Sequence, residues 1–529
     1  MMRAIKRLFG IGSDFRSGVK IVINKEKLET RVALVENGTL EEYTIERSDS
    51  DNVVGSIFKG KVRNLEAGLK AMFVDIGFEK NAFLHYWDAI PAALDEELEA
   101  IDRGGKSKRP KITSKDIPTI YPVGSEVMVQ VTKGPIGNKG PRVTTNISLA
   151  GRYMVLMPRN DQFGISRKIE DPKERLRLRR IMERLSVPDG MGIILRTAAQ
   201  GMKARYFVRD LAMLLEQWQQ VEANNANKKS PARVFNEPDL VERTVRDFLT
   251  EEVDEVICDD QATTERMRNL AGQISRRSKR RIRQFSGGQS IFDHFGIQKQ
   301  IDNAFFRQVW LPCGGYLVID ETEAMIAVDV NTGRNKGAKD LDKTILQTNL
   351  EAATEVARQV RLRNIGGLIV VDFIDMKAER DRKAVYKTMR DGLKRDKAKT
   401  QVLPISPFGL MEMTRQRLHE SLSTSVFDPC PYCHGQGRIK TPTSMSVELQ
   451  RKLHSLLPTL PENQRDVLIV VHPDVMQRLR KEDADHLMEI ERRHLCRLTF
   501  RSDAAFHREK MVIADAATGN ELVKPSASS

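Results

Sequence analysis

The segments Met325-Ile-Ala-Val-Asp-Val-Asn331 and Gly367-Leu-Ile-Val-Val-Asp-Phe-Ile-Asp375 decide the fold of the central part of this chain. Each is a short apolar run that ends in aspartate, as a buried β-strand does where it reaches the edge of a sheet. Between them, residues 344–363 repeat apolar side chains every three to four positions, which predicts a helix. Strand, helix and strand in this order predict a parallel crossover, so Asp329 and Asp372 should end neighbouring strands.

Two carboxylates and an amide should therefore meet at one sheet edge, the usual place for a ligand in such sheets. Asn331 lies two residues beyond Asp329, so its side chain points to the same face of the strand. Oxygen ligands in this position suit Mg²⁺, which can polarise a phosphoryl oxygen and help to activate water. Aspartates that merely cap loops are common, but the second aspartate-bearing strand end and the basic surroundings favour the metal. Asp375 is interpreted as a supporting residue.

The composition predicts a large protein with a polyanionic partner. A chain of 529 residues is too long for one core, so we expect three or more domains. Its 86 Lys and Arg against 72 Asp and Glu give a net charge of +14. This charge favours nucleic acid first and an anionic membrane surface second. The longest apolar runs are far shorter than the roughly 20 residues of a membrane span.

The N-terminus and the cysteines favour the cytoplasm. Residues 1–10 are basic but have no continuous apolar segment and no small-residue cleavage site, so we predict no secretory signal. A weak peripheral contact of this segment with a membrane stays open. Five cysteines in a chain of this length argue against a disulfide scaffold and fit a reducing compartment.

Several local patterns predict the remaining elements. Residues 19–47 alternate apolar and polar side chains around Asn37-Gly38, which predicts a hairpin. Closely spaced short strands over 52–90 predict a small barrel. The polar, charged segment 91–118 predicts a mobile loop, and residues 238–260 are expected to be rich in helix.

Aromatic and basic residues of the predicted barrel are typical of a site for single-stranded nucleic acid. Bases stack on aromatic rings while lysines contact phosphates, and Phe73, Phe83, Lys59 and Lys61 supply both groups. The competing interpretation, that the two phenylalanines belong to the barrel core, is the stronger one on these residues alone.

Two basic features carry less specific signals. Arg196-Thr197 ends a predicted strand and could grip a phosphate through a guanidinium fork and a hydroxyl. An ordinary surface pair is the commoner case for such a dipeptide. The basic cluster at 276–283 either lines a nucleic-acid path or is a solvated edge strand.

Cys430 and Cys433 predict a zinc site, because a Cys-x-x-Cys followed by glycines resembles a zinc knuckle. Haem attachment would need export, and a redox pair should open a helix after a strand, whereas prolines and glycines surround this pair. Zinc takes four ligands. Either His434 and a distant residue complete the site, or a second chain supplies its own pair, and we favour a zinc shared between two chains.

These features, in this order, resemble the RNase E/G family of bacterial endoribonucleases over roughly residues 19–515. The resemblance rests on several long runs of residues. They are Lys59-Gly-Lys61, Ala71-Met-Phe-Val-Asp-Ile-Gly77, Leu195-Arg-Thr-Ala198, Ala327-Val-Asp-Val-Asn331, Asn349-Leu-Glu-Ala-Ala353, Gly366-Gly-Leu-Ile-Val-Val-Asp-Phe-Ile-Asp-Met376, Phe408-Gly-Leu-Met-Glu-Met-Thr-Arg-Gln-Arg417 and Cys430-Pro-Tyr-Cys433.

The resemblance implies a role for each matching residue. Asp329 and Asp372 would hold the catalytic Mg²⁺, and Asn331 would help to position water or the scissile phosphate. Three residues would contact single-stranded RNA: Phe73, Phe83 and Lys139. Four would bind a 5′-terminal monophosphate: Arg196, Thr197, Gly151 and Val155. Cys430 and Cys433 would share a structural zinc with a second protomer, giving a homodimer that can pair into a homotetramer.

The implied fold is α+β and multidomain, with an S1-type OB barrel beside RNase H-like and DNase I-like α/β subdomains. The expected boundaries are 1–50 for an N-terminal extension and the first part of the RNase H-like subdomain, 51–146 for the S1-type barrel, 147–240 for a 5′-sensor, 241–304 for the RNase H-like subdomain, 305–427 for the DNase I-like catalytic subdomain, 428–440 for the zinc-link and 441–529 for a small α/β domain.

The implied reaction is hydrolysis of single-stranded, AU-rich RNA to 5′-phosphate and 3′-hydroxyl ends, in ribosomal RNA maturation or messenger RNA decay. The lack of a long disordered tail favours the short, RNase G-like type, although a shortened form of a longer protein could also end here. Thr332-Gly333 and Pro407 depart from the residues more often seen in the family. The alternative function is that of an RNA-binding, translation-associated protein without catalysis.

Overall fold

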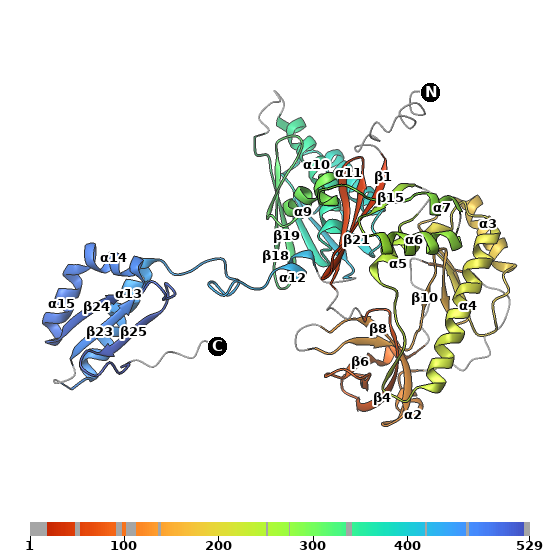
Figure 1. Cartoon of the computed structure of the whole chain (residues 1–529). Helices are drawn as coiled ribbons and strands as arrows, with labels where there is room; N and C mark the ends of the chain where they lie inside the picture. The colour runs from red at the N-terminus through yellow and green to blue at the C-terminus, as the bar shows by residue number, and fades with distance from the viewer. Residues whose placement is uncertain are drawn as a thin grey trace. The chain divides into compact units, whose positions relative to one another are not determined.

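The computed structural model describes most of the chain, and its described residues are 18–47, 53–90, 98–101, 113–135, 139–249, 252–274, 276–334, 341–417, 421–461 and 465–522. They form two compact units, Met1–Ser425 and Val426–Ser529 (Figure 1). The basic N-terminus and most of the expected 91–118 loop lie outside the described residues. None of the described helices is long and apolar enough to cross a membrane.

The first sheet joins residues from both ends of the first 300 positions. Its strands in spatial order are β16 (Ile282–Gln284), β15 (Val253–Cys258), β1 (Val19–Lys25), β2 (Glu29–Glu36) and β3 (Thr39–Arg47). The predicted hairpin is confirmed, with Asn37 and Gly38 at positive φ of 50° and 84° between β2 and β3. One face packs on α5 (Leu240–Asp247) and α6 (Gln261–Ile274).

The prediction that 238–260 is rich in helix is wrong for Val253–Cys258. This segment is strand β15, an inner strand that runs parallel to the central strand β1. Val256 and Cys258 pack with one core cluster and Ile257 with the other. A strand buried on both faces shows no alternation, so its apolar run is easily mistaken for a helical segment.

A closed five-stranded barrel follows, in agreement with the predicted small barrel. Its strands are β4 (Ile57–Glu66), β5 (Ala71–Asp75), β6 (Ala82–His85), β9 (Arg142–Thr144) and β8 (Glu126–Lys133), and β4 closes the ring by pairing with β8. Strand β14 (Ala232–Phe235) adds to β4 from a later part of the chain. The interior is filled by side chains such as Val62, Met72 and Leu84. Two short helical turns, η1 (Tyr86–Ala89) and α2 (Ile117–Ile120), contribute Tyr86, Ala89 and Ile117 to the same core.

A mixed sheet and two helices come next. The strands are β10 (Leu149–Ala150), β11 (Met154–Met157), β13 (Gly192–Leu195), β12 (Phe163–Ser166) and β7 (Leu98–Ile101), with α3 (Pro172–Glu183) and α4 (Ala204–Asn227) packed nearby. Helix α4 buries Phe207, Leu211, Leu214, Trp218 and Val221, a spacing of three and four that gives one apolar face.

The loop expected at 91–118 is corrected at Leu98–Ile101. These residues form β7, which pairs antiparallel with β12. The strand therefore belongs to the mixed sheet, although its residues lie between two barrel strands in the sequence. Glu99 in this strand bonds to Arg175 and Arg179 of α3. A four-residue edge strand held by partners about 65 to 80 positions away carries no local signal of its own.

The sheet that contains Asp329 and Asp372, here called the aspartate sheet, has six strands. In spatial order they are β17 (Gln308–Trp310), β18 (Tyr316–Glu321), β19 (Met325–Asn331), β20 (Gly367–Asp372), β22 (Leu410–Arg415) and β21 (Thr400–Val402). The predicted crossover is confirmed: β19 and β20 run parallel and are joined by α10 (Leu341–Leu362). Helices α10 and α11 (Glu379–Leu393) cover one face of this sheet (Figure 1).

Two small helices, α8 (Ile291–His294) and α9 (Gln298–Ala304), share a core with the first sheet and with Leu362 at the end of α10. Two further short helices are α7 (Arg276–Arg280) and α12 (Leu422–Val426).

The second unit is a three-stranded sheet with three helices around it. Its elements are α13 (Pro442–Leu456), β23 (Asp466–Val471), α14 (Pro473–Lys481), α15 (Ala484–His494), β24 (Arg497–Ser502) and β25 (Met511–Asp515).

Candidate functional site

Asp329 and Asp372 end neighbouring parallel strands and are direct register partners. Residues of β19 alternate between buried and exposed, and both aspartates lie on the exposed face, opposite the core that faces α10 and α11. Asn331 projects from the same face, and its Nδ2 donates a hydrogen bond of 2.8 Å to Oδ2 of Asp329. The structure therefore brings together the three residues that the sequence selected.

The electrostatics of this cluster suit a cation. Partial burial and the nearby charges of Asp329 and Asp375 raise the pKa of Asp372 above its usual range. A bound cation would relieve this repulsion between carboxylates. Among the described residues, no group of three or more His, Cys, Asp or Glu side chains is arranged around one point. Two carboxylates on one face of a sheet are a donor set that Mg²⁺ accepts, because this ion keeps several of its own waters.

A buried amide fixes the chain just beyond Asp372. Asn349 of α10 donates from Nδ2 to the carbonyl of Ile374 at 2.8 Å and accepts from the Ile374 N–H at 3.2 Å. On the other side, a Cβ added at Gly409 would lie 3.2 Å from Oδ1 of Asp375. Sequence reasoning assigned Asn349 no role, although a polar residue on the apolar face of α10 was a signal for one.

Arg196 lies at the end of β13 and is held by two acceptors. Its Nη1 donates to the carbonyl of Gly151 and to Oδ1 of Asp247, both at 2.6 Å. Burial acts to raise the pKa of Asp247, but the guanidiniums of Arg196 and Arg246 outweigh it and lower that pKa. The remaining Nε and Nη2 donors of Arg196 can form a fork with a phosphate.

The other three residues predicted to bind a 5′-terminal phosphate lie beside Arg196, and the four residues Arg196, Thr197, Gly151 and Val155 are here called the arginine pocket. Thr197 Oγ1 is 3.2 Å from Oγ of Ser166, and Val155 of β11 pairs with both Ala150 and Ile194. Gly151 follows Ala150 in the same hairpin. The four predicted residues of the pocket therefore come from one small region of the sheet.

Asp210 of α4 shapes the turn that contains Gly151. Its carboxylate accepts the backbone N–H groups of Arg152, Tyr153 and Met154 at 2.8–3.1 Å. A Cβ added at Gly151 would lie 2.7 Å from this carboxylate, so only glycine fits. Burial, the largest effect, raises the pKa of Asp210 even though these N–H groups oppose the rise. Sequence reasoning missed both Asp210 and Asp247, because their partners are 51 to 58 positions away.

The barrel carries an aromatic strip on its outer surface. Phe73 and Phe83 are cross-strand partners, with ring centroids 5.8 Å apart, and both are half-buried rather than part of the core. His85 extends the strip and stacks on Trp87, which is exposed. Lys139 is exposed, and the N–H of Phe83 donates to the carbonyl of Pro141 nearby. The surface interpretation of the two phenylalanines thus fits the structure better than the core interpretation.

Lys59, expected to contact phosphate, is instead a structural residue. Its Nζ donates to the carbonyls of Asn225 and Lys228 and forms an ion pair with Glu126 at 3.0 Å. These contacts attach the barrel to the end of α4. No local pattern indicates this role, because the two carbonyl acceptors of Lys59 lie at the end of a distant helix, whereas Lys61 is exposed.

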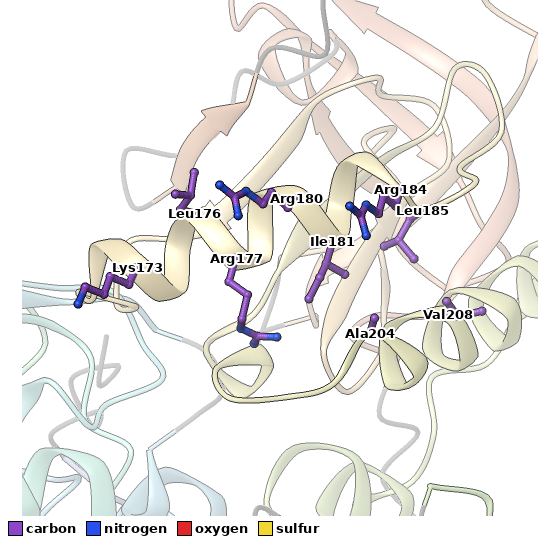
Figure 2. A pocket seen from close by; sticks show the side chains of 9 residues that line it. All are labelled: Lys173, Leu176, Arg177, Arg180, Ile181, Arg184, Leu185, Ala204 and Val208. Atoms are coloured by element: carbon purple, nitrogen blue, oxygen red, sulfur yellow. The ribbon is translucent and has the colours of Figure 1, made fainter.

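A groove of about 390 Å³ lies between α3 and the start of α4 (Figure 2). It is lined by four basic and five apolar side chains: Lys173, Arg177, Arg180, Arg184, Leu176, Ile181, Leu185, Ala204 and Val208. Arg177 is bound to Glu174 and to the carbonyl of Met202. The lining holds no carboxylate and no aromatic ring, so the groove suits an anionic group but offers no surface for base stacking.

Cys430 and Cys433 lie in a turn ahead of α13. The N–H of Gly437 donates to Sγ of Cys433 at 3.3 Å, and His434 and Gly435 both have positive φ. Hydrogen bonds from the backbone N–H groups of Cys433 and Tyr432 lower the pKa of Cys430. A thiol poised to ionise, in a turn with N–H···S bonding, fits a zinc ligand. The pair does not open a helix after a strand, as a redox pair would.

Comparisons with known proteins agree with these features. A family model described as "Ribonuclease E/G family" matches residues 148–418, which is just over half of the chain. A second model, "RNase E/G, Thioredoxin-like domain", matches residues 429–516. The chain belongs to the ribonuclease E/G family. Its second unit is accordingly a thioredoxin-like domain of that family.

Individual members of the ribonuclease E/G family support the same conclusion. Ribonuclease G of Escherichia coli K12 is 37% identical over 472 residues, which is 89% of this chain and 94% of that protein. Ribonuclease G of Haemophilus influenzae is 35% identical over 470 residues. Ribonuclease E of E. coli K12 is 36% identical over 477 residues, but this match spans only 44% of that longer protein.

The family models locate the candidate residues. The aspartate pair, Asn331 and the whole arginine pocket fall within 148–418, and both cysteines of the turn fall within 429–516. The aromatic strip of the barrel precedes both matched ranges. Its assignment to RNA binding therefore depends on its exposed rings and on the likeness to whole relatives.

Proposed function

We propose that this chain is a Mg²⁺-dependent endoribonuclease that cleaves single-stranded, AU-rich RNA and prefers 5′-monophosphorylated ends. Its products are 5′-phosphate and 3′-hydroxyl ends, and its role is in cytoplasmic ribosomal RNA maturation or messenger RNA decay. Family membership and the likeness to ribonucleases G and E identify the chain as an endoribonuclease. The observation that carries the finer proposal is the register pairing of Asp329 with Asp372.

Asp329 and Asp372 would hold the metal through one carboxylate each. When bound, Mg²⁺ supplies Lewis-acid stabilisation of the charge that develops on the phosphoryl oxygens. Asn331 orients Asp329 through its 2.8 Å hydrogen bond and can present its amide to water or to the phosphate. Asn349 holds the backbone of the segment after Asp372 through its two hydrogen bonds with Ile374.

The barrel and the arginine pocket supply the binding energy in this proposal. Phe73 and Phe83, which are half-buried at the outer surface of the barrel, offer their rings to unpaired bases, and Lys139 offers its charge to a phosphate. Arg196, Thr197, Gly151 and Val155 form the pocket for a 5′-terminal monophosphate. The net charge of +14 attracts RNA to both surfaces.

Replacing Arg196 should remove the preference for a 5′-monophosphate. With Arg196→Gln we expect kcat/KM on 5′-monophosphorylated RNA to fall roughly ten-fold or more, to the value for 5′-hydroxyl RNA, since a charge-assisted contact contributes about 1.5–3 kcal/mol. The measurement compares the two substrates for each variant. Arg380→Gln, which removes a fully exposed arginine of α11, is the matched control and should keep the preference. A preference that persists in Arg196→Gln would rule out this role.

The cysteine turn should hold one zinc per two chains. We expect metal analysis of the purified protein to give this ratio, and a strong chelator to convert dimers to monomers, because each turn supplies only two thiolates. Cys430→Ser should lose both zinc and dimer, whereas Cys496→Ser, a partly buried cysteine of the same unit, should keep them. One zinc per chain in a stable monomer would contradict the shared site.

A further inference from the structure

An aromatic pair lies on the same face of the aspartate sheet as the two carboxylates. Trp310 of β17 pairs with Tyr316 of β18, and Tyr316 pairs in turn with Asn331 of β19. The two rings are 5.4 Å apart between centroids, at 59° to each other. Trp310, Tyr316 and Asn331 therefore form a row across three neighbouring strands, and the amide of Asn331 at the end of this row donates to Asp329.

Packing within the fold does not explain the position of Trp310. The buried residues of these strands, such as Leu317 and Val330, face α10 and α11 on the other side of the sheet. Trp310 is 56% exposed, although tryptophan is among the largest apolar side chains. A large ring left exposed on the face that carries charged groups indicates a binding surface rather than a core residue.

Arg334 is held over this ring by a contact between two turns. Its guanidinium lies over Trp310 at 5.8 Å from the ring centroid. The N–H of Arg334 donates to the carbonyl of Gly314 at 3.0 Å. The preceding Gly333 has a φ of 54°, and a Cβ there would lie 2.5 Å from the same carbonyl. This close approach fixes the backbone at Gly333 and sets Arg334 above the indole.

The spacing of the strands sets the distance to the reacting group. Neighbouring strands lie about 4.8 Å apart, so Trp310 is roughly 10 Å from the line of β19 and roughly 15 Å from that of β20. A base on the indole would thus belong to a nucleotide close to the phosphate at the aspartates. An aromatic ring beside a cation suits an unpaired base and its phosphate, whereas the α3–α4 groove has cations but no ring.

We propose that Trp310 stacks an unpaired RNA base beside the scissile phosphate, with Tyr316 supporting the indole and Arg334 contacting the adjoining phosphate. This inference rests on the proposed function, because it takes the phosphate at Asp329 and Asp372 as the point of cleavage. It adds a subsite on the catalytic sheet itself, separate from the barrel strip and from the arginine pocket. Stacking of this kind tolerates any base, so the subsite would grip the strand rather than read its sequence.

The decisive experiment combines a protein change with a substrate change. Short single-stranded RNAs with one defined cleavage site would carry an abasic nucleotide at each successive position around that site. Removing the base that stacks on Trp310 should lower kcat/KM of the wild-type protein roughly ten-fold, and it should have no further effect in Trp310→Ala. Trp310→Phe should keep most of the sensitivity. Phe306→Ala removes another exposed aromatic ring, placed before the start of β17, and should behave like wild type.

A binding measurement separates failure of this inference from failure of the proposed function. The chain has three tryptophans; Trp218 is buried and Trp87 is exposed on the barrel. In a Trp87→Phe, Asp372→Asn protein, the intact RNA should quench the fluorescence of Trp310, and an abasic nucleotide at one position of the same series should abolish this quenching. This result holds even if no variant cleaves RNA.

Three outcomes would overturn the subsite. The first is equal sensitivity of wild type and Trp310→Ala to every abasic position, and the second is quenching that does not depend on the base. The third is a change in oligomeric state of Trp310→Ala with RNA kinetics unaltered, which would identify the exposed ring as a protein contact instead.

Discussion

Asp329→Asn and Asp372→Asn should each lower the rate of RNA cleavage at least about a thousand-fold while leaving RNA affinity nearly unchanged. The two carboxylates are register partners at the ends of β19 and β20, so either change removes half of the charge that would hold the metal. A bound metal stabilises the transition state by several kcal/mol, and about 1.4 kcal/mol corresponds to a factor of ten. Binding should persist because the barrel and the arginine pocket are separate surfaces.

Single-turnover cleavage of a labelled, 5′-monophosphorylated RNA over a range of Mg²⁺ concentrations would measure this effect. Asp320→Asn is the matched control, since Asp320 belongs to the neighbouring strand β18 but is paired with Arg307 rather than with a carboxylate. It should retain activity close to wild type. Cleavage by Asp372→Asn at the normal rate would refute the site. Tight binding by the wild-type protein without any Mg²⁺-dependent product would instead favour the non-catalytic alternative.

Asp396→Ala should destabilise the first unit by about 3–5 kcal/mol, because it leaves a buried guanidinium without its counter-ion. The side chains of Asp396 and Arg415 are only 2% and 4% exposed. Arg415 donates from Nε and Nη2 to the two carboxylate oxygens at 2.7 and 3.1 Å, and from Nη1 to the carbonyl of Ile365 at 2.8 Å. This network joins β22 to the end of α11 and to the start of β20.

Denaturant unfolding of the full chain would test this prediction, with the second unit, Val426–Ser529, as an internal reference whose transition should not move. Glu379→Ala removes an ion pair with Lys383 in which both side chains are at least 70% exposed. It should leave the unfolding midpoint of the first unit almost unchanged, because solvent screens an exposed ion pair. If Asp396→Ala and Glu379→Ala reduce the stability of the first unit by similarly small amounts, the buried ion pair contributes less to stability than its burial suggests. A double replacement by apolar residues should recover much of the loss, since no unpaired charge would remain.

Local signals in the sequence predicted the elements whose partners lie nearby. Asn37-Gly38 predicted a hairpin because both residues tolerate positive φ, and the helix between two apolar runs predicted the parallel pair β19 and β20. Local signals did not predict the strands and contacts whose partners are distant in the sequence. The apolar run of β15 predicts helix but forms a strand beside β1, and Lys59, grouped by the sequence with the barrel residues for RNA, donates to carbonyls at the end of α4, more than 160 positions away.

The order of elements along the chain determined the position of the aspartate pair. A strand, a helix and a second strand place two carboxylates at one edge of the sheet, because a right-handed crossover returns the chain to a neighbouring strand. Tertiary structure alone decided what surrounds that edge. The register of β17, β18 and β19 aligns Trp310 and Tyr316 with Asn331, and a contact between two turns sets Arg334 over the indole. Register and turn packing depend on how separate segments fit together, and no local pattern of residues encodes that fit.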